Sequence, residues 1–215
     1  MRREETNNGL TDKLKKWWGI LCDFLISGLL CGLLCLPVIT AGASVTAALE
    51  YGFRRLRERE ASLFSEFFAT FKKYFKPATA LWLPIMLAAA VICANLIFYY
   101  RAADSWLRIM GLAFCIAAAL LDLLLEETAF ACLLFFPGRW AETVRRSLWL
   151  GLRHFGQVLL SVAIKAGLMA AALYVPVLWI AVPGLMLLFH CLLLRAAFRK
   201  YDRTEDGEDS SIIIE

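Results

Sequence analysis

Long apolar stretches alternate with short basic ones along the whole chain. Each apolar stretch reaches or exceeds the length of about 20 residues that an α-helix needs to cross the hydrocarbon core of a bilayer. A soluble chain of 215 residues has no core large enough to bury four stretches of this length. The pattern therefore predicts an all-α, polytopic membrane helical bundle. The stretches cover residues 20–39, 78–100, 107–136 and 155–194, and the last is long enough for two spans.

The first apolar stretch ends near Pro37, and its continuation decides the topology. Cytoplasmic loops of membrane proteins carry an excess of Lys and Arg. A single crossing would place the richest basic segment, residues 54–76, outside the cell. If the chain turns at Pro37 and returns, every basic segment lies on one side. We therefore predict a turn at Pro37 and both termini in the cytoplasm, with these basic segments on the same side: residues 2–16, 54–76, 139–153 and 195–203.

The returning segment has only about 13 apolar residues before Arg54, which is short for a full crossing. Small side chains allow such a segment to approach a neighbouring helix closely. Arg54 and Arg55 can extend their charged groups to the lipid headgroups. We expect five full spans and one short returning helix that continues to about residue 60. The small residues are Ala41, Gly42, Ala43, Ser44, Ala47 and Ala48.

Two segments have apolar side chains at helical spacing among basic ones, residues 62–75 and residues 141–160. Each is followed by a membrane stretch, so we interpret both as amphipathic helices in the membrane interface, rather than as soluble core helices. Pro77 is expected to end the first or to start the next helix. The aromatic face of the first consists of Phe64, Phe67, Phe68, Phe71 and Phe75.

These patterns suggest an N-terminal hairpin followed by two similar units. The predicted divisions are residues 1–61, a transmembrane hairpin with a charged extension; 62–136 and 137–201, each an interfacial helix plus a transmembrane hairpin; and 202–215, a disordered acidic tail.

Composition agrees with a membrane protein, with 60% hydrophobic residues, 20% charged residues and a mean hydropathy of +0.64. The net charge of +4 is explained by basic segments beside anionic lipid. No folded module for reading nucleic acid is visible, so the expected partner is the lipid bilayer and nucleic acid is not expected.

Seven cysteines all fall inside apolar stretches. Cys31 and Cys35 are one helical turn apart, a spacing that suits a metal or a disulfide. Buried cysteine more often acts as a small hydrophobic residue, and no Cys-x-x-Cys pair or nearby His supports a metal site. No catalytic motif appears either. We therefore expect no metal, no cofactor and no enzymatic activity.

Ionisable side chains inside predicted spans are the candidate functional residues, because they are costly there and usually face the bundle interior. At 1.5 Å per helical residue, Glu126, Lys165 and His190 lie roughly 12–16 Å from the basic ends of their spans. Asp122 and Glu126 share a helical face, whereas Glu127 points about 100° away. The candidate polar cluster comprises Asp122, Glu126, Glu127, Lys165 and His190, and Asp23 is a further charge in the first span.

Two interpretations of this cluster remain open. In one, Asp122, Glu126, Lys165 and His190 line a polar cavity or a proton-coupled path. In the other, Lys165 pairs with Glu126 or Asp122 and simply holds two helices in register.

The segments "LPVITAGASVTAAL" and "RRLREREASLFSEFFATFKKYFKPA" resemble the signature of the bacterial YesL family, a domain of unknown function. The resemblance covers roughly residues 20–80 and implies a plasma-membrane protein whose genes often lie among those for carbohydrate uptake. It implies no established activity. The matching residues are Leu36, Pro37, Thr40, Gly42, Ala47, Arg54, Glu58, Phe64, Phe68, Phe71 and Phe75.

Two functions are consistent with these observations. The first is an auxiliary or regulatory membrane component associated with carbohydrate uptake, whose partners would be sugar transporter subunits. The second is a small stand-alone transporter that uses the polar cluster. The sequence does not predict an oligomeric state.

Overall fold

A computed structural model describes residues 2–57, 62–101, 105–136, 138–175 and 178–202. Over these ranges the regular structure is helical throughout, so the predicted all-α fold is confirmed. The elements are α1 (Arg2–Leu34), the 3₁₀-helix η1 (Val38–Thr40), α2 (Ala41–Leu56), α3 (Leu63–Arg101), α4 (Ser105–Phe135), α5 (Trp140–Arg153), α6 (Phe155–Tyr174) and α7 (Leu178–Asp202).

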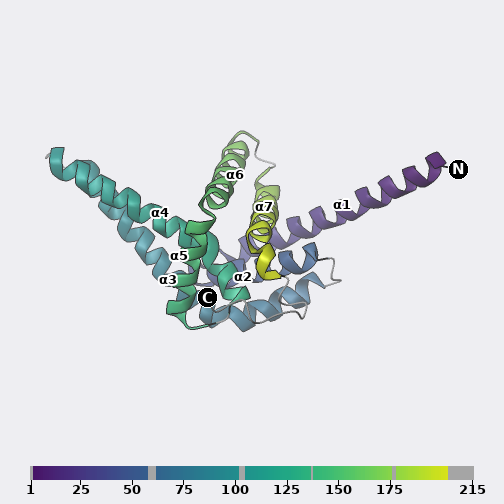
Figure 1. Ribbon diagram of the computed structural model, residues 1–215, viewed down its shortest axis with the longest axis horizontal. Coiled ribbons are helices and arrows are strands. Elements are labelled where there is room, and N and C mark those ends of the chain that lie inside the picture. The colour runs from purple at the N-terminus through teal and green to yellow at the C-terminus, as the bar shows by residue number, and fades with distance from the viewer. Residues whose placement is uncertain (1, 58–61, 102–104, 137, 176–177, 203–215) are drawn as a thin grey trace.

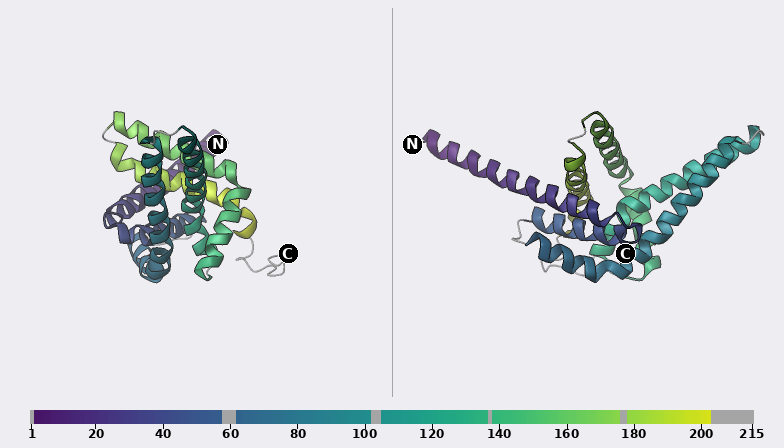
Figure 2. Two further views of the ribbon diagram at one scale, coloured as in Figure 1. Left: turned by 90° about the vertical axis from the view of Figure 1, so that its left-hand side faces the viewer. Right: turned by 180° about the vertical axis from the view of Figure 1, so that it is seen from behind.

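The long helices leave a common central region in different directions. Helix α1 extends to one side, the paired helices α3 and α4 extend to the opposite side, and the α6–α7 hairpin stands between them (Figures 1 and 2). The hydrophobic core lies where the helices converge. It contains buried side chains from six helices, among them Phe24, Leu49, Leu81, Phe130, Leu150 and Cys191.

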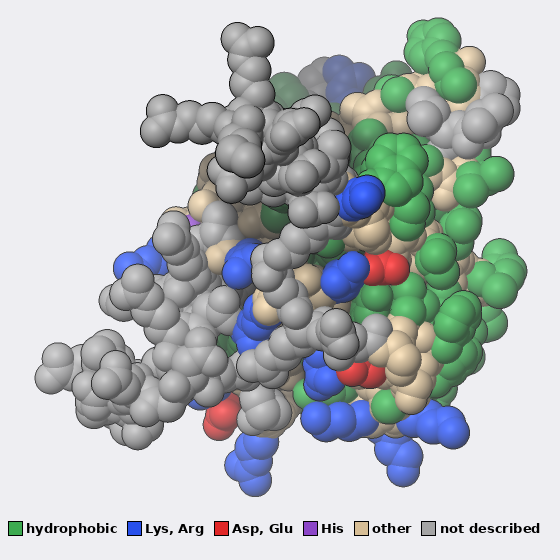
Figure 3. Space-filling model, turned by 90° about the vertical axis from the view of Figure 1, so that its right-hand side faces the viewer, with side chains coloured by type: hydrophobic (Ala, Val, Ile, Leu, Met, Phe, Trp, Pro, Cys, Tyr) green, Lys and Arg blue, Asp and Glu red, His purple; other side chains and the backbone are tan. Residues whose placement is uncertain are grey.

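Four helices of the described chain contain a segment long and apolar enough to cross a membrane: Trp17–Leu34, Leu63–Arg101, Trp106–Phe135 and Phe155–Tyr174. The apolar part of α7, Trp179–Arg195, is shorter. Many large apolar side chains on these helices are exposed, as a lipid environment requires. Figure 3 shows hydrophobic side chains covering one side of a molecular face whose lower part carries Lys and Arg. The chain is a multi-pass membrane protein.

The chain turns back after α1, as predicted. The Thr40 hydroxyl fixes the turn, because its Oγ1 lies 2.5 Å from the carbonyl oxygen of Leu34 and 2.8 Å from that of Pro37. The returning helix α2 is mostly buried and contacts α1, α3, α4 and α7. It ends at Leu56 rather than near residue 60, and residues 58–61 lie outside the described part of the chain.

Helix α3 corrects the expectation that Pro77 ends one helix or starts the next. The helix continues through Pro77 and Pro84 to Arg101 and changes direction partway along its length (Figure 1). Proline removes one backbone donor and crowds the preceding turn, so a helix that continues through it bends. Both prolines are exposed, which leaves room for such a bend. The segment predicted to lie in the interface and the following span are therefore one helix.

The sequence predicted one aromatic face at the start of α3, but in the structure these aromatic side chains differ in burial. Phe67 is fully buried and packs against Ala47 and Ala48 of α2, whereas Phe64 and Phe68 are 61% and 42% exposed. The second amphipathic segment does break, at His154 between α5 and α6. The two proposed units thus differ in how their amphipathic segments join the spans. Residues 203–215 of the predicted acidic tail lie outside the described ranges.

Candidate functional site

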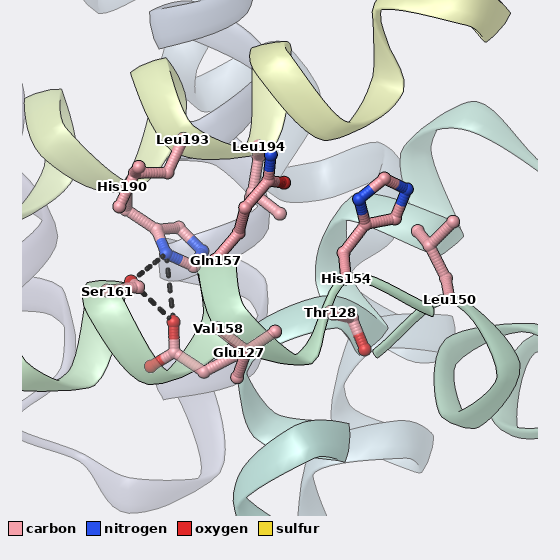
Figure 4. Close-up of a pocket in the computed structure, with 10 residues that line it drawn as sticks. All are labelled: Glu127, Thr128, Leu150, His154, Gln157, Val158, Ser161, His190, Leu193 and Leu194. Carbon is pink, nitrogen blue, oxygen red and sulfur yellow. Dashed lines mark hydrogen bonds and ion pairs between the residues drawn. The ribbon is translucent and has the colours of Figure 1, made fainter. Parts of the chain in front are cut away.

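A single buried carboxylate, that of Glu127 in α4, contacts two other helices. Its Oε1 lies 2.6 Å from Nζ of Lys165, and its Oε2 accepts a hydrogen bond of 2.9 Å from Oγ of Ser161. Lys165 and Ser161 both belong to α6. The same Oε2 lies 3.1 Å from Nδ1 of His190 on α7. Figure 4 shows Glu127, Ser161 and His190 pointing toward one another. The carboxylate therefore joins α4, α6 and α7 at one point.

The predicted pairing of Lys165 with Glu126 or Asp122 is wrong. Lys165 pairs with Glu127, the residue expected to turn away. Glu126 is exposed and Asp122 is half-buried. Among the described residues neither forms an ion pair or a side-chain hydrogen bond. The reason is rotational: helices α6 and α7 pack on the face of α4 that carries Glu127, about 100° from that of Glu126.

Local spacing explains how α6 and α7 present these groups. Ser161 and Lys165 are four residues apart and so lie on one face of α6. Oγ of Ser161 also lies 3.3 Å from Nδ1 of His190, a contact whose donor depends on the histidine tautomer. With its proton on Nδ1, His190 donates to the Glu127 carboxylate. Both oxygens of the Glu127 carboxylate then have partners within the described chain.

Helix α5 holds α4 in place beside this cluster. Oγ1 of Thr128 donates to the carbonyl oxygen of Leu124, 2.7 Å away, and lies 3.0 Å from that of Ser147 in α5. Gly151 of α5 packs against Leu124. These close contacts between small and hydroxyl-bearing residues fix the position of the Glu127 side chain.

A small cavity of about 20 Å³ adjoins the cluster. That volume holds about one water molecule. Oε1 of Gln157 is buried near it without a hydrogen-bond partner in the described chain, and His154 lies at its other end (Figure 4). The lining residues are Glu127, Thr128, Leu150, His154, Gln157, Val158, Ser161, His190, Leu193 and Leu194.

Asp23, the remaining charge in the first predicted span, has a partner that the sequence did not indicate. Its Oδ2 lies 2.5 Å from Nε of Arg55, so the pair joins α1 to α2. Arg54 similarly lies 2.5 Å from Glu50 and 3.5 Å from Glu66. The basic end of α2 is therefore neutralised by nearby carboxylates.

The residues that carry the YesL resemblance mostly shape the contact between the turn, α2 and α3. Gly42 is pressed against α3, because a Cβ there would lie 2.7 Å from Cβ of Trp82. Nε1 of Trp82 donates to the carbonyl oxygen of Val38, 2.8 Å away, and Ala47 is fully buried. Leu36 and Pro37 are exposed at the turn, and Phe71 and Phe75 are partly buried. Glu58 lies outside the described residues.

Sequence reasoning missed the crossing of α1 and α7. A Cβ on Gly28 would lie 2.3 Å from the backbone nitrogen of Gly184, so the two backbones touch. The available signal was a glycine in the middle of each apolar stretch, since small residues allow close helix contacts in membranes.

The cysteines form no disulfide within the described chain. Cys31 and Cys35 place their Sγ atoms 3.9 Å apart at the end of α1. No group of three or more His, Cys, Asp or Glu side chains that could hold a metal ion is present in the described ranges.

Comparison with known protein families gives a match over the N-terminal part of the chain. Residues 17–96 match a family described as "Protein of unknown function, DUF624". The matched stretch, less than half of the chain, contains the apolar part of α1, the turn, α2 and most of α3. Neither a curated protein nor a solved structure matches the chain. The N-terminal part is thus similar to a domain of unknown function, over the region where the resemblance was predicted.

Proposed function

We propose that this chain is a YesL-like auxiliary membrane component that associates with carbohydrate transporter subunits, and that it neither moves a solute alone nor catalyses a reaction. The carbohydrate association follows from the resemblance of residues 20–80 to the YesL family. The same resemblance implies a location in the bacterial plasma membrane, and the distribution of basic segments supports an orientation with both termini in the cytoplasm.

One observation carries the proposal that the chain does not transport alone. The Glu127 carboxylate is occupied by Lys165, Ser161 and His190, as expected for a contact that holds three helices together. The adjoining cavity of about 20 Å³ is too small for a sugar. A stable polar contact of this kind suits a structural subunit.

A stand-alone transporter remains a second candidate for a specific reason. Glu127, Lys165 and His190 are titratable groups from three different helices that meet beside a cavity with an unpaired amide oxygen on Gln157. Ionisable groups in such positions often mark ion or substrate pathways.

Two measurements distinguish these functions. The tagged full chain, solubilised from native membranes in mild detergent, should copurify with permease subunits of a carbohydrate transporter, identified by mass spectrometry. The purified chain in liposomes should accumulate no labelled sugar above protein-free liposomes. Sugar uptake that is lost in Lys165→Met but retained in Lys72→Met, an exposed lysine on α3, would instead support the transporter. Absence of permease subunits from the native complex would contradict the auxiliary role.

A further inference from the structure

Helix α5 is fastened at both ends to membrane-spanning segments. The apolar segment of α4 ends at Phe135, five residues before Trp140, and α6 begins at Phe155, directly after His154. With connections this short, α5 must lie close to the membrane surface where α4 and α6 emerge. It packs on α4 through Ser147 and Gly151, and Thr143 is buried on the same side, so the opposite face of α5 points outward.

The outward face of α5 combines aromatic and basic side chains. Arg145, Trp149, Leu152 and Arg153 follow at steps of four, three and one residues and therefore share one side of the helix. Trp149 and Leu152 are 53% and 58% exposed. The guanidinium of Arg153 lies 5.0 Å from the centre of the Trp149 ring. Exposed tryptophan beside arginine is typical of groups at the level of lipid headgroups.

The arginines of α5 lack the carboxylate partners that Arg54 and Arg55 of α2 have. Arg54 and Arg55 at the end of α2 pair with carboxylates. In the described chain no carboxylate pairs with Arg145, Arg146 or Arg153, all of which are exposed. Arg146 instead lies over the ring of Phe136. Glu142, one turn before Arg145 and Arg146, is the one carboxylate in the sequence of α5, so the three arginines leave this helix with a net positive charge that favours an anionic partner.

We propose that the outer face of α5 binds anionic phospholipids. The arginines engage the headgroup phosphate, to which the planar guanidinium can donate two parallel hydrogen bonds. Trp149 and Leu152 insert beside the upper acyl chain. The inference is independent of the proposed function, because it requires no transporter partner.

The test uses the full chain purified in nonionic detergent. Tryptophan fluorescence is recorded during titration with phosphatidylglycerol or phosphatidylcholine carrying brominated acyl chains, which quench nearby tryptophan. We expect tighter binding of phosphatidylglycerol, and a quenched fraction that falls in Trp149→Phe. The double variant Arg145→Gln/Arg146→Gln should weaken binding of phosphatidylglycerol about tenfold or more while leaving phosphatidylcholine unaffected.

A matched variant tests whether lipid binding depends on the surface of α5 or only on the net charge of the protein. Lys72→Gln/Lys73→Gln removes the same charge from exposed lysines of α3 and should change binding less than twofold. Arg153→Gln provides a second variant if the double arginine variant does not fold. Equal affinity for both lipids, equal effects of the two double variants, or displacement of the lipid by millimolar inorganic phosphate would each overturn the proposal.

Discussion

The side chain of Glu127 makes contacts among three helices, so a change at its ionic partner Lys165 should lower the stability of the fold. Lys165→Met leaves the carboxylate without its cation. Removing one member of a buried pair typically costs about 3–5 kcal/mol, but polar groups in membranes find other partners, and Lys165 is 31% exposed. We expect the free energy of unfolding to fall by roughly 1–3 kcal/mol, measured by thermal unfolding in detergent.

Second substitutions test whether Glu127 is the partner. Adding Glu127→Gln to Lys165→Met removes the stranded charge, and much of the lost stability should return because an amide can still bond Ser161. Adding Glu126→Gln instead should restore little, since that side chain is exposed. Equal recovery in the two double variants would show that the Lys165–Glu127 contact does not stabilise the fold.

At this scale the sequence located the candidate residues but not their pairing. Depth along a span follows from counting residues, so Glu127, Lys165 and His190 could be placed at similar levels. Which of Glu126 and Glu127 faces the neighbouring helices depends on the rotation of α4. Thr128, Ser147 and the packing of α6 and α7 determine that rotation, and hydropathy carries little information about it.

Among the helices, the crossing of α1 and α7 depends on two glycines. In Gly184→Ala the new Cβ would lie 2.5 Å from Cα of Leu25, so the helices must separate. We expect the free energy of unfolding to fall by about 3 kcal/mol, with a lower melting temperature in detergent.

The matched control for this crossing is Gly32→Ala, also in α1. A Cβ there would meet no atom within 4 Å. Because alanine favours a helix over glycine by up to about 1 kcal/mol, this variant should be unchanged or slightly more stable. A similar loss of stability in both variants would mean that the close backbone contact is not what matters.

The helices themselves were more predictable from the sequence than the places where they begin, end or continue into one another. Apolar length and basic segments are local properties, and they indicated the turn after α1 and the short helix α2. The continuity of α3 through Pro77 was not predicted, because proline restricts the helix locally whereas burial of Phe67 and Ala78 on either side favours a continuous helix. The hydrophobic periodicity of the second segment, residues 141–160, likewise did not indicate the break at His154.

For the whole molecule the proposed topology can be tested by labelling. In a variant with every native cysteine replaced by alanine, single cysteines at Glu60, Asp104 and Arg139 are treated in intact cells with a membrane-impermeant maleimide. The turn after α1 and the positive-inside rule predict that only position 104 is labelled. All three positions should react once the cells are permeabilised, which controls for accessibility. External labelling at position 60 would contradict the proposed orientation.

The uninterrupted helix α3 connects the centre of the molecule to its periphery. Phe67 fixes its first part among buried residues of α2, and Arg101 marks its far end. Beyond Pro84 the helix extends roughly 26 Å. A change of about 10° at the prolines therefore displaces the far end by roughly 4–5 Å, by geometry over that length. Because α3 packs against α4, a small rearrangement beside α2 would be amplified into a larger displacement at the far end of the α3–α4 pair.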